Sequence, residues 1–419
     1  MNTFDATPTD FSHVSPNASA AACSEAGWSL VARILCFLVV SRLVFEAVNT
    51  FGWDSASYAW SACALVAILF ILWPLVMTLA RGEGNLLVTY FPVLAFLLIM
   101  LVRTQFGDTY SLKCLLSEVI VGSCLLFTVE TCERCDRAAT LLRKWLMWVI
   151  QANILLGVGQ LIWAGVRGAG FSPAALLQAR AVQGVFIHPN LFIVVVLPFL
   201  FYFLKQRSWI WCLLTLIACL GTGTRSPFFA AACLIIPIWQ SARRRPITWL
   251  HLGVTLLLVL IGYTLLIRAN QSSWEYDPDL RTNLSTLQWR IAHWNNFLED
   301  RGMRAIWFGH GVGTADNLGG VFGEEPQAPH NDYVRTYYDL GLVGLLATAM
   351  LIGFMIRRLM RSTTTDNDFV LLAYLLIVCF RVTDNFMYIT VPLWIYMFVG
   401  CYLGKPTSQS TGPALEEST

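Results

Sequence analysis

Polar side chains that could take part in acid–base chemistry gather in the stretch PHNDYVRTYYDLGLVG, which covers residues 329–344. The apolar run LVGLLATAMLIGFM begins inside this stretch, so His330 is expected near the start of a membrane helix. The positive end of a helix dipole disfavours a protonated imidazole. A neutral His330 could then accept a proton as a general base.

The neighbours of His330 offer helix caps and a cation. Asn331 and Asp332 are residue types that cap helix N-termini, and Arg335 lies four residues after Asn331 on roughly the same face. We predict that Asn331 and Arg335 bind substrate beside His330. The alternative is a purely structural helix start, followed by a belt of tyrosines at the water interface. These tyrosines are Tyr333, Tyr337 and Tyr338, of which Tyr338 is also a predicted substrate-binding residue.

Two glycines follow in the same segment. Gly341 and Gly344 are three residues apart and are predicted to lie on one side of the helix. Small residues on one face allow a neighbouring helix to approach closely. The pair is therefore expected to fix the helix that carries His330.

Arginines in other segments could supply positive charge to the same site. Arg225 precedes Pro227, which fits the first turn of a helix, and a helix N-terminus favours an anion. Arg290 lies in an amphipathic segment, one turn before Trp294. Each has a structural alternative, because Arg225 could extend its charge to the membrane interface and Arg290 could stack on Trp294.

Further polar residues on the predicted outer side complete the candidate site. They are Arg180, His188, Asn190 and Asp384, which we predict to bind substrate together with Trp294. Taken alone, His188 is more typical of an interfacial histidine than of a catalyst. Several guanidinium groups around a neutral histidine suit a phosphate-rich leaving group and a hydroxyl acceptor, because arginine holds phosphate in a rigid fork. No cluster of His, Cys or carboxylates has metal-ligand spacing, so we predict neither a metal nor another cofactor.

The elements that must position these residues are membrane helices. The chain is 56% hydrophobic and 13% charged, whereas a soluble domain carries about 25% charged residues. A span needs about 20 apolar residues, and the sequence predicts an all-α polytopic protein with twelve spans. They cover residues 28–48, 58–80, 86–102, 112–130, 141–166, 185–204, 208–221, 226–240, 247–268, 337–356, 368–383 and 386–403.

Basic residues give the predicted orientation. Loops on one side carry fourteen Lys and Arg, and the short loops on the other side carry five. The basic side is cytoplasmic, which places both termini inside. Helices 1–9 then occupy residues 28–268 and helices 10–12 occupy 337–403, with a large outer loop over 269–336 that contains the amphipathic helix. Residues 1–27 form a polar N-terminal tail, and 404–419 form a disordered tail.

These motifs resemble the bacterial O-antigen ligase and O-antigen polymerase superfamily of integral-membrane glycosyltransferases. The family pattern of a His-Asn pair, nine residues and Gly-x-x-Gly is met by His330-Asn331 and by residues 341–344. Arg290, Trp294 and the turn FGHGVGT resemble an upstream element. Arg225 resembles the family's arginine at a helix turn, and residues 184–190 resemble its G-x-F-x-x-P-N element. The resemblance covers roughly residues 180–400.

The resemblance implies a class C glycosyltransferase-like bundle in the inner membrane. Its donor would be a glycan on undecaprenyl pyrophosphate, moved without nucleotide sugar or metal to an acceptor hydroxyl at the periplasmic face. Arg225 and Arg290 would bind the pyrophosphate with help from Arg180, and His330 would orient or deprotonate the acceptor. Direct attack would invert the anomeric configuration.

Three functions stay open at this point. The HNDYVR form of the motif favours a polymerase of O-antigen or exopolysaccharide repeat units, because Arg335 would suit a second pyrophosphate carrier. The first alternative is a ligase that joins the glycan to lipid A-core. A transporter or flippase for lipid-linked sugars is the alternative of another class, which the absence of an internal repeat disfavours. A flippase and a chain-length regulator are expected partners of a polymerase, and the net charge of +2 does not suggest nucleic acid.

Overall fold

The computed structural model describes residues 16–50, 60–69, 91–169, 182–184, 186, 189–224, 232, 234–243, 245–271, 290, 293–295, 297–298, 302–317, 329–362, 368–382 and 393–403. Every regular element in these ranges is a helix, which confirms the all-α prediction for this part of the chain. The chain ends 1–15 and 404–419 lie outside the described residues. So do four predicted site residues, namely Arg180, His188, Arg225 and Asp384.

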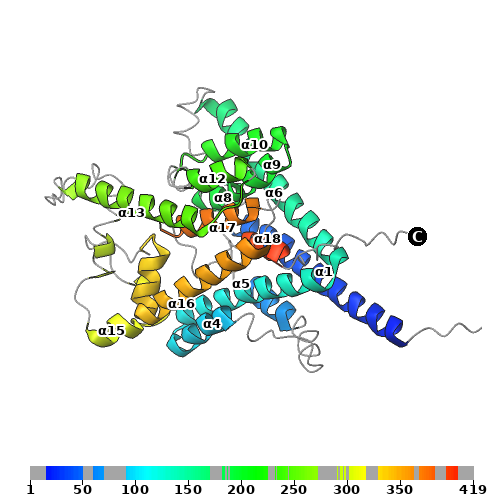
Figure 1. Ribbon diagram of the computed structural model, residues 1–419, viewed down its shortest axis with the longest axis horizontal. Helices are drawn as coiled ribbons and strands as arrows, with labels where there is room; N and C mark the ends of the chain where they lie inside the picture. The colour runs from blue at the N-terminus through cyan, green and yellow to red at the C-terminus, as the bar shows by residue number, and fades with distance from the viewer. Residues whose placement is uncertain are drawn as a thin grey trace, which may run out of the picture.

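Most of the described helices overlap segments that hydropathy predicts, whereas Met303–Phe308 and Thr314–Asn317 lie within the predicted outer loop (Figure 1). The described helices are α1 (Pro16–Thr50), a helix over Trp60–Leu69, α4 (Phe91–Arg103), α5 (Thr109–Arg134), α6 (Asp136–Ala164), the π-helix η1 (Gly165–Ala169), α8 (Pro189–Val196), α9 (Pro198–Lys205), α10 (Trp209–Leu220), α12 (Ile235–Ala242), α13 (Trp249–Gln271), α15 (Met303–Phe308), the 3-10 helix η3 (Thr314–Asn317), α16 (Asp332–Ser362), α17 (Asp368–Phe380) and α18 (Leu393–Leu403).

Several helix ends differ from the predicted boundaries. α1 begins at Pro16, inside the segment predicted as a polar tail, and α13 continues to Gln271. α16 begins at Asp332 rather than at residue 337. The predicted boundaries follow hydropathy, whereas a helix starts where the first backbone N–H groups find caps. At α16 that cap is the polar segment before the apolar run.

Among the described residues, three helical stretches are long and apolar enough to cross a membrane: Thr109–Arg134, Asp136–Arg167 and Asp332–Arg361. Shorter apolar helices accompany them, among them α10, α17 and α18. These helices support a multi-pass membrane protein. The number of twelve spans and the outer loop between α13 and α16 stay predictions.

Two hydrophobic clusters hold the described helices together. The larger cluster joins α1, α5, α6, α8, α9, α17 and α18. The smaller cluster forms where α4, α5 and α16 meet, and it includes Phe96, Met100, Leu340 and Val312 of a glycine-rich turn. Val312 has no exposed surface, and complete burial of such a side chain stabilises the fold by about 2 kcal/mol. The smaller cluster thus anchors the turn against the membrane helices.

α16 is bent at Gly341, where φ is 67° and ψ is −165°. Figure 1 shows its short first part and its long second part meeting at an angle. The prediction that Gly341 and Gly344 share one regular helical face is wrong, because this backbone conformation interrupts the helix and is essentially restricted to glycine. The predicted close approach does occur at Gly341. A Cβ there would lie 2.4 Å from the carbonyl carbon of Trp307.

Ion pairs at the two ends of α16 involve different groups of arginines. At its start, Arg381 pairs with Asp332 at 3.0 Å. Near its end, Arg358 pairs with Glu133 of α5. The distribution of basic residues in the sequence predicts Arg381 on the outer side of the membrane and Arg358 on the inner side. The two ion pairs therefore lie at opposite ends of α16.

Candidate functional site

His330 lies directly before α16 in an uncommon backbone conformation. Its φ is +50°, a left-handed value that few residues other than glycine adopt and that costs about 1–2 kcal/mol. The Oδ1 of Asn331 caps the helix, accepting hydrogen bonds from the N–H groups of Tyr333 (2.9 Å) and Val334 (3.2 Å). The prediction that Asn331 is a helix cap is confirmed. Such strain persists only where neighbouring contacts hold it, and it is often found at functional sites.

Trp294 joins the amphipathic segment to the chain just before His330. Its Nε1 donates a hydrogen bond to the carbonyl of Pro329 at 2.5 Å, and its side chain is buried. The described residues of this segment are helical, as its amphipathic pattern predicts. Arg290 lies one turn before Trp294, so the helix that carries it contacts the His330 segment.

A glycine-rich turn, residues 309–315, packs on the first part of α16. The Asp339 carboxylate accepts hydrogen bonds from the N–H of Gly313 (3.0 Å), the hydroxyl of Thr314 (3.0 Å) and the N–H of Ala315 (2.8 Å). Asp339 has no exposed surface. Buried carboxylates require such partners, and here the partners all belong to the turn, so Asp339 fixes its shape.

Two glycines let the backbones of the turn and α16 touch. Gly309 has φ 68° and ψ −170°, nearly the conformation of Gly341. A Cβ on Gly309 would lie 2.3 Å from the carbonyl carbon of Asp339, just as one on Gly341 would meet the backbone of Trp307. Each glycine therefore lies against the backbone of the other's segment. No side chain fits at either position.

Asp316 links the turn to two helices. It forms an ion pair with Arg335 of α16, and it accepts a hydrogen bond from the hydroxyl of Tyr110 of α5. Arg335 is only 5% exposed. The last residue of α4 adds another link, because Arg103 Nη2 donates to the carbonyl of Gly309 at 2.8 Å. The guanidinium of Arg335 is thus engaged within the protein.

A row of aromatic rings runs from the Arg290 helix to the turn. His293 contacts Phe297 with ring centroids 4.9 Å apart, and Phe297 contacts Tyr338 at 5.2 Å. Tyr338 stacks on His310 at 4.5 Å, and its carbonyl accepts the His310 N–H at 2.9 Å. His293 is fully buried and His310 is exposed. Tyr338 is therefore held in the middle of three converging segments.

Residues that lie next in sequence to three further predicted site residues contact one another. Asn190 Oδ1 accepts a hydrogen bond from the Thr224 hydroxyl at 2.9 Å. The N–H of Val182 donates to the carbonyl of Gly221 at 3.3 Å. The segments next to the three predicted residues thus lie together at the end of α10. These three residues, which lie outside the described ranges, are Arg180, His188 and Arg225.

The central part of this site lies in a segment that matches a known protein family. Residues 210–349 match the family model described as O-antigen ligase. The resemblance to the O-antigen ligase and polymerase superfamily is confirmed. The search of curated proteins gives no match for the chain.

The matched segment, residues 210–349, contains both Arg225 and Arg290, together with the glycine-rich turn and the His330 segment. Asn190 and Arg381 lie outside the matched range. The matched segment therefore includes the three residues predicted to be catalytic, whereas part of the predicted substrate-binding set comes from the rest of the chain.

Some residues that hold the matched segment together are not predicted from the sequence. Asp339 and Asp316 organise the turn, and Arg103 and Tyr110 reach it from another part of the chain. A signal for Asp339 exists in the sequence, because a carboxylate placed directly before an apolar run needs buried partners. No comparable signal connects Arg103 or Tyr110 with the turn, because each is separated from its partner by 206 residues in the sequence.

The geometry can present a histidine and an arginine from two segments that contact each other. His330 is partly exposed as a residue, and its Nδ1 atom is buried. Arg290 is also partly exposed. Over the ranges that the structure describes, no group of three or more His, Cys, Asp or Glu side chains could hold a metal ion.

Proposed function

We propose that this chain is an inverting glycosyltransferase of the bacterial inner membrane. It moves a glycan from undecaprenyl pyrophosphate to a sugar hydroxyl at the periplasmic face. One observation carries the proposal: the bond from Trp294 to Pro329 brings the Arg290 helix to the His330 segment, within the part that matches the O-antigen ligase family. A cation for the donor and a base for the acceptor then belong to one site.

The reaction that fits these groups is a direct displacement. The acceptor hydroxyl gives its proton to His330 while its oxygen attacks the anomeric carbon of the donor glycan. The bond from that carbon to the pyrophosphate oxygen breaks, and undecaprenyl pyrophosphate leaves with one more negative charge. Arg290 and Arg225 stabilise that charge. Attack opposite the leaving group inverts the anomeric configuration.

We propose roles for the other residues of the candidate site, and for three of them described contacts support the role. Trp294 and Asn331 hold the His330 segment, and Arg335 supports the turn through Asp316. Substrate contacts are proposed for Arg180, His188, Asn190, Tyr338 and Asp384. The proposal includes twelve spans, cytoplasmic termini and a periplasmic loop between α13 and α16.

Replacing Arg290 with alanine is expected to lower the turnover of glycan transfer by about 10²–10³-fold, the usual effect of losing a group that stabilises developing charge. Lysine at this position restores only part of the rate, because it lacks the bidentate fork. Transfer is measured with purified protein and a labelled lipid-linked glycan.

Arg304 of α15 provides a matched control for Arg290. It carries the same charge in the same region of the chain and is exposed. Arg304→Ala is expected to keep wild-type turnover. If Arg290→Ala transfers glycan as fast as Arg304→Ala, Arg290 does not stabilise the leaving group.

The proposal has two forms, a polymerase and a ligase, which differ in the acceptor of the glycan. Polymerisation of repeat units was favoured because Arg335 would serve a second pyrophosphate carrier, but Arg335 pairs with Asp316. The matching family model is described as O-antigen ligase. Both forms are therefore retained: a polymerase of a surface polysaccharide, working with a flippase and a chain-length regulator, and a ligase that uses lipid A-core.

Deletion of the gene separates the two forms. A polymerase deletion is expected to leave single repeat units on the lipid A-core or the carrier and no long chains. A ligase deletion is expected to leave polymer on undecaprenyl pyrophosphate and a bare core. The measurement is gel and mass analysis of surface and carrier-linked glycans. Unchanged glycans in the deletion strain would contradict both forms.

A further inference from the structure

Asp332 and Arg381 form a reciprocal contact at the start of α16. Arg381 Nε donates to Asp332 Oδ2 at 3.0 Å, and the Asp332 N–H donates to the carbonyl of Arg381 at 2.8 Å. Asp332 is 0% exposed and Arg381 is 9% exposed. The contact joins the first residue of α16 to the residue that follows α17.

Stability alone gives a poor reason for this pair. Exchanging a buried ion pair for apolar residues is often neutral or stabilising, because both charges must be removed from water. Ionisable residues buried within membrane helices usually mark functional regions. We therefore ask whether the ion pair between Asp332 and Arg381 helps to set the geometry of the site.

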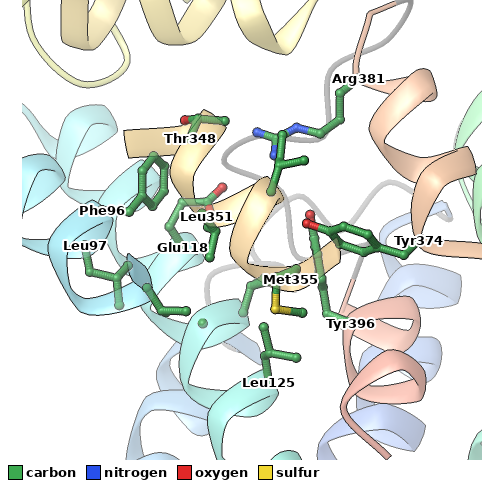
Figure 2. Close-up of a pocket in the computed structure, with 14 residues that line it drawn as sticks. Phe96, Leu97, Glu118, Leu125, Thr348, Leu351, Met355, Tyr374, Arg381 and Tyr396 are labelled. Carbon is green, nitrogen blue, oxygen red and sulfur yellow. The ribbon is translucent and has the colours of Figure 1, made fainter. Parts of the chain in front are cut away.

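The surroundings of Arg381 do not suit an anionic ligand. Its side chain extends over a cavity of about 60 Å³ between α4, α5, α16, α17 and α18. Figure 2 shows Arg381 pointing toward Thr348, with the hydroxyls of Tyr374 and Tyr396 also directed into the cavity. Among the lining residues Arg381 is the cation and Glu118 the carboxylate, and the Asp332 carboxylate is bound to Arg381. Two carboxylates beside one guanidinium disfavour a phosphate.

The pair acts instead on the segment that carries His330. Asp332 comes two residues after His330, whose φ of +50° must be held by its neighbours. Pro329 is held before it by Trp294, and Asn331 caps the helix after it. The Asp332 N–H, which has no partner within the helix, donates to the Arg381 carbonyl. The pair thus fixes the chain on the C-terminal side of His330.

We propose that Asp332 and Arg381 are positioning residues for glycan transfer, which hold His330 in its left-handed conformation and aim its imidazole at the acceptor hydroxyl. The inference rests on the proposed function, since it gives the pair a role in that reaction. Neither residue touches substrate. Their effect should therefore appear in turnover rather than in substrate affinity.

The test compares Asp332→Ala with Asp332→Asn, which keeps an oxygen that can accept from Arg381 Nε. We expect kcat to fall by about 10–100-fold in Asp332→Ala, since small misplacements of a catalytic group have such effects, with KM nearly unchanged. Asp332→Asn should fold normally and recover much of the loss. If Asp332→Ala does not fold, Arg381→Lys replaces it, because it keeps the charge and loses the Nε donor.

A second readout does not depend on transfer. Diethyl pyrocarbonate modifies accessible histidines, and the modified peptides are quantified by mass spectrometry. His330 is expected to react severalfold faster in Asp332→Ala, as its segment loosens, whereas His251 of α13 should keep its rate. If the wild-type chain transfers no glycan, the proposed function fails, while the His330 rates still decide whether the pair positions this segment.

Asp368→Asn is the matched control. Asp368 pairs with Lys205 at 3.2 Å and is buried at the opposite end of α17. Its substitution is expected to lower the unfolding temperature without changing kcat or the His330 rate. The positioning role is overturned if Asp332→Ala keeps wild-type kcat and His330 reactivity, or if Asp368→Asn changes both as strongly.

Discussion

Replacing His330 with asparagine is expected to lower the turnover of glycan transfer by about 10²–10⁴-fold, the range that a general base contributes. Asparagine adopts the left-handed backbone conformation comparatively well, so the φ of +50° at this position should persist in the variant. The variant therefore removes the imidazole and keeps the start of α16. Turnover is measured on purified, folded protein.

Two further variants separate the effect of losing the imidazole from the effect of changing the backbone preference at residue 330. His330→Ala is expected to lose the same activity and also about 1 kcal/mol of stability, because alanine is less tolerant of the left-handed region. His251→Asn, a substitution on α13, should keep the wild-type turnover and the wild-type stability. Activity near the wild-type level in His330→Asn would exclude His330 as the base.

Replacing Gly341 with alanine is expected to prevent stable folding of the site. The backbone at Gly341, with φ 67° and ψ −165°, is essentially restricted to glycine and costs another residue about 1–3 kcal/mol. The added Cβ would also lie 2.4 Å from the backbone carbon and oxygen of Trp307, neither of which can move alone. We expect a large fall in the unfolding temperature and in the yield of monodisperse protein.

Gly353 in the same helix is the matched control for Gly341. A Cβ there would meet nothing within 4 Å, and alanine favours a helix over glycine by about 1 kcal/mol. Gly353→Ala should therefore match or exceed the wild-type unfolding temperature. If Gly341→Ala behaves like Gly353→Ala, the bend in α16 does not depend on glycine.

The sequence predicts the all-helical class and two features of the segments around His330. Long apolar runs can only be helices in a membrane, because every backbone polar group must be paired within the segment. Asn331 was predicted as a cap from its type and place, and its hydrogen bonds confirm this. The amphipathic pattern around Trp294 also predicted a helix, which the described residues bear out.

Other features depend on contacts that no local pattern specifies. The two glycines were read as a packing face, whereas Gly341 breaks the helix against the backbone of Trp307. Arg335 was predicted to serve the substrate, and its guanidinium pairs with Asp316 across the turn. The pairing of Asp332 with Arg381 joins residues 49 positions apart. Such partners are chosen by tertiary packing, so one sequence without its fold does not reveal them.

The central claim is that this chain transfers a lipid-linked glycan with His330 as the base. The most direct measurement uses the purified chain in lipid nanodiscs with a labelled glycan on undecaprenyl pyrophosphate and either lipid A-core or a second lipid-linked unit. The account predicts that the wild-type chain releases undecaprenyl pyrophosphate and lengthens one acceptor, and that His330→Asn does neither. A wild-type chain that leaves both acceptors unchanged, or a His330→Asn variant as active as the wild type, would contradict it.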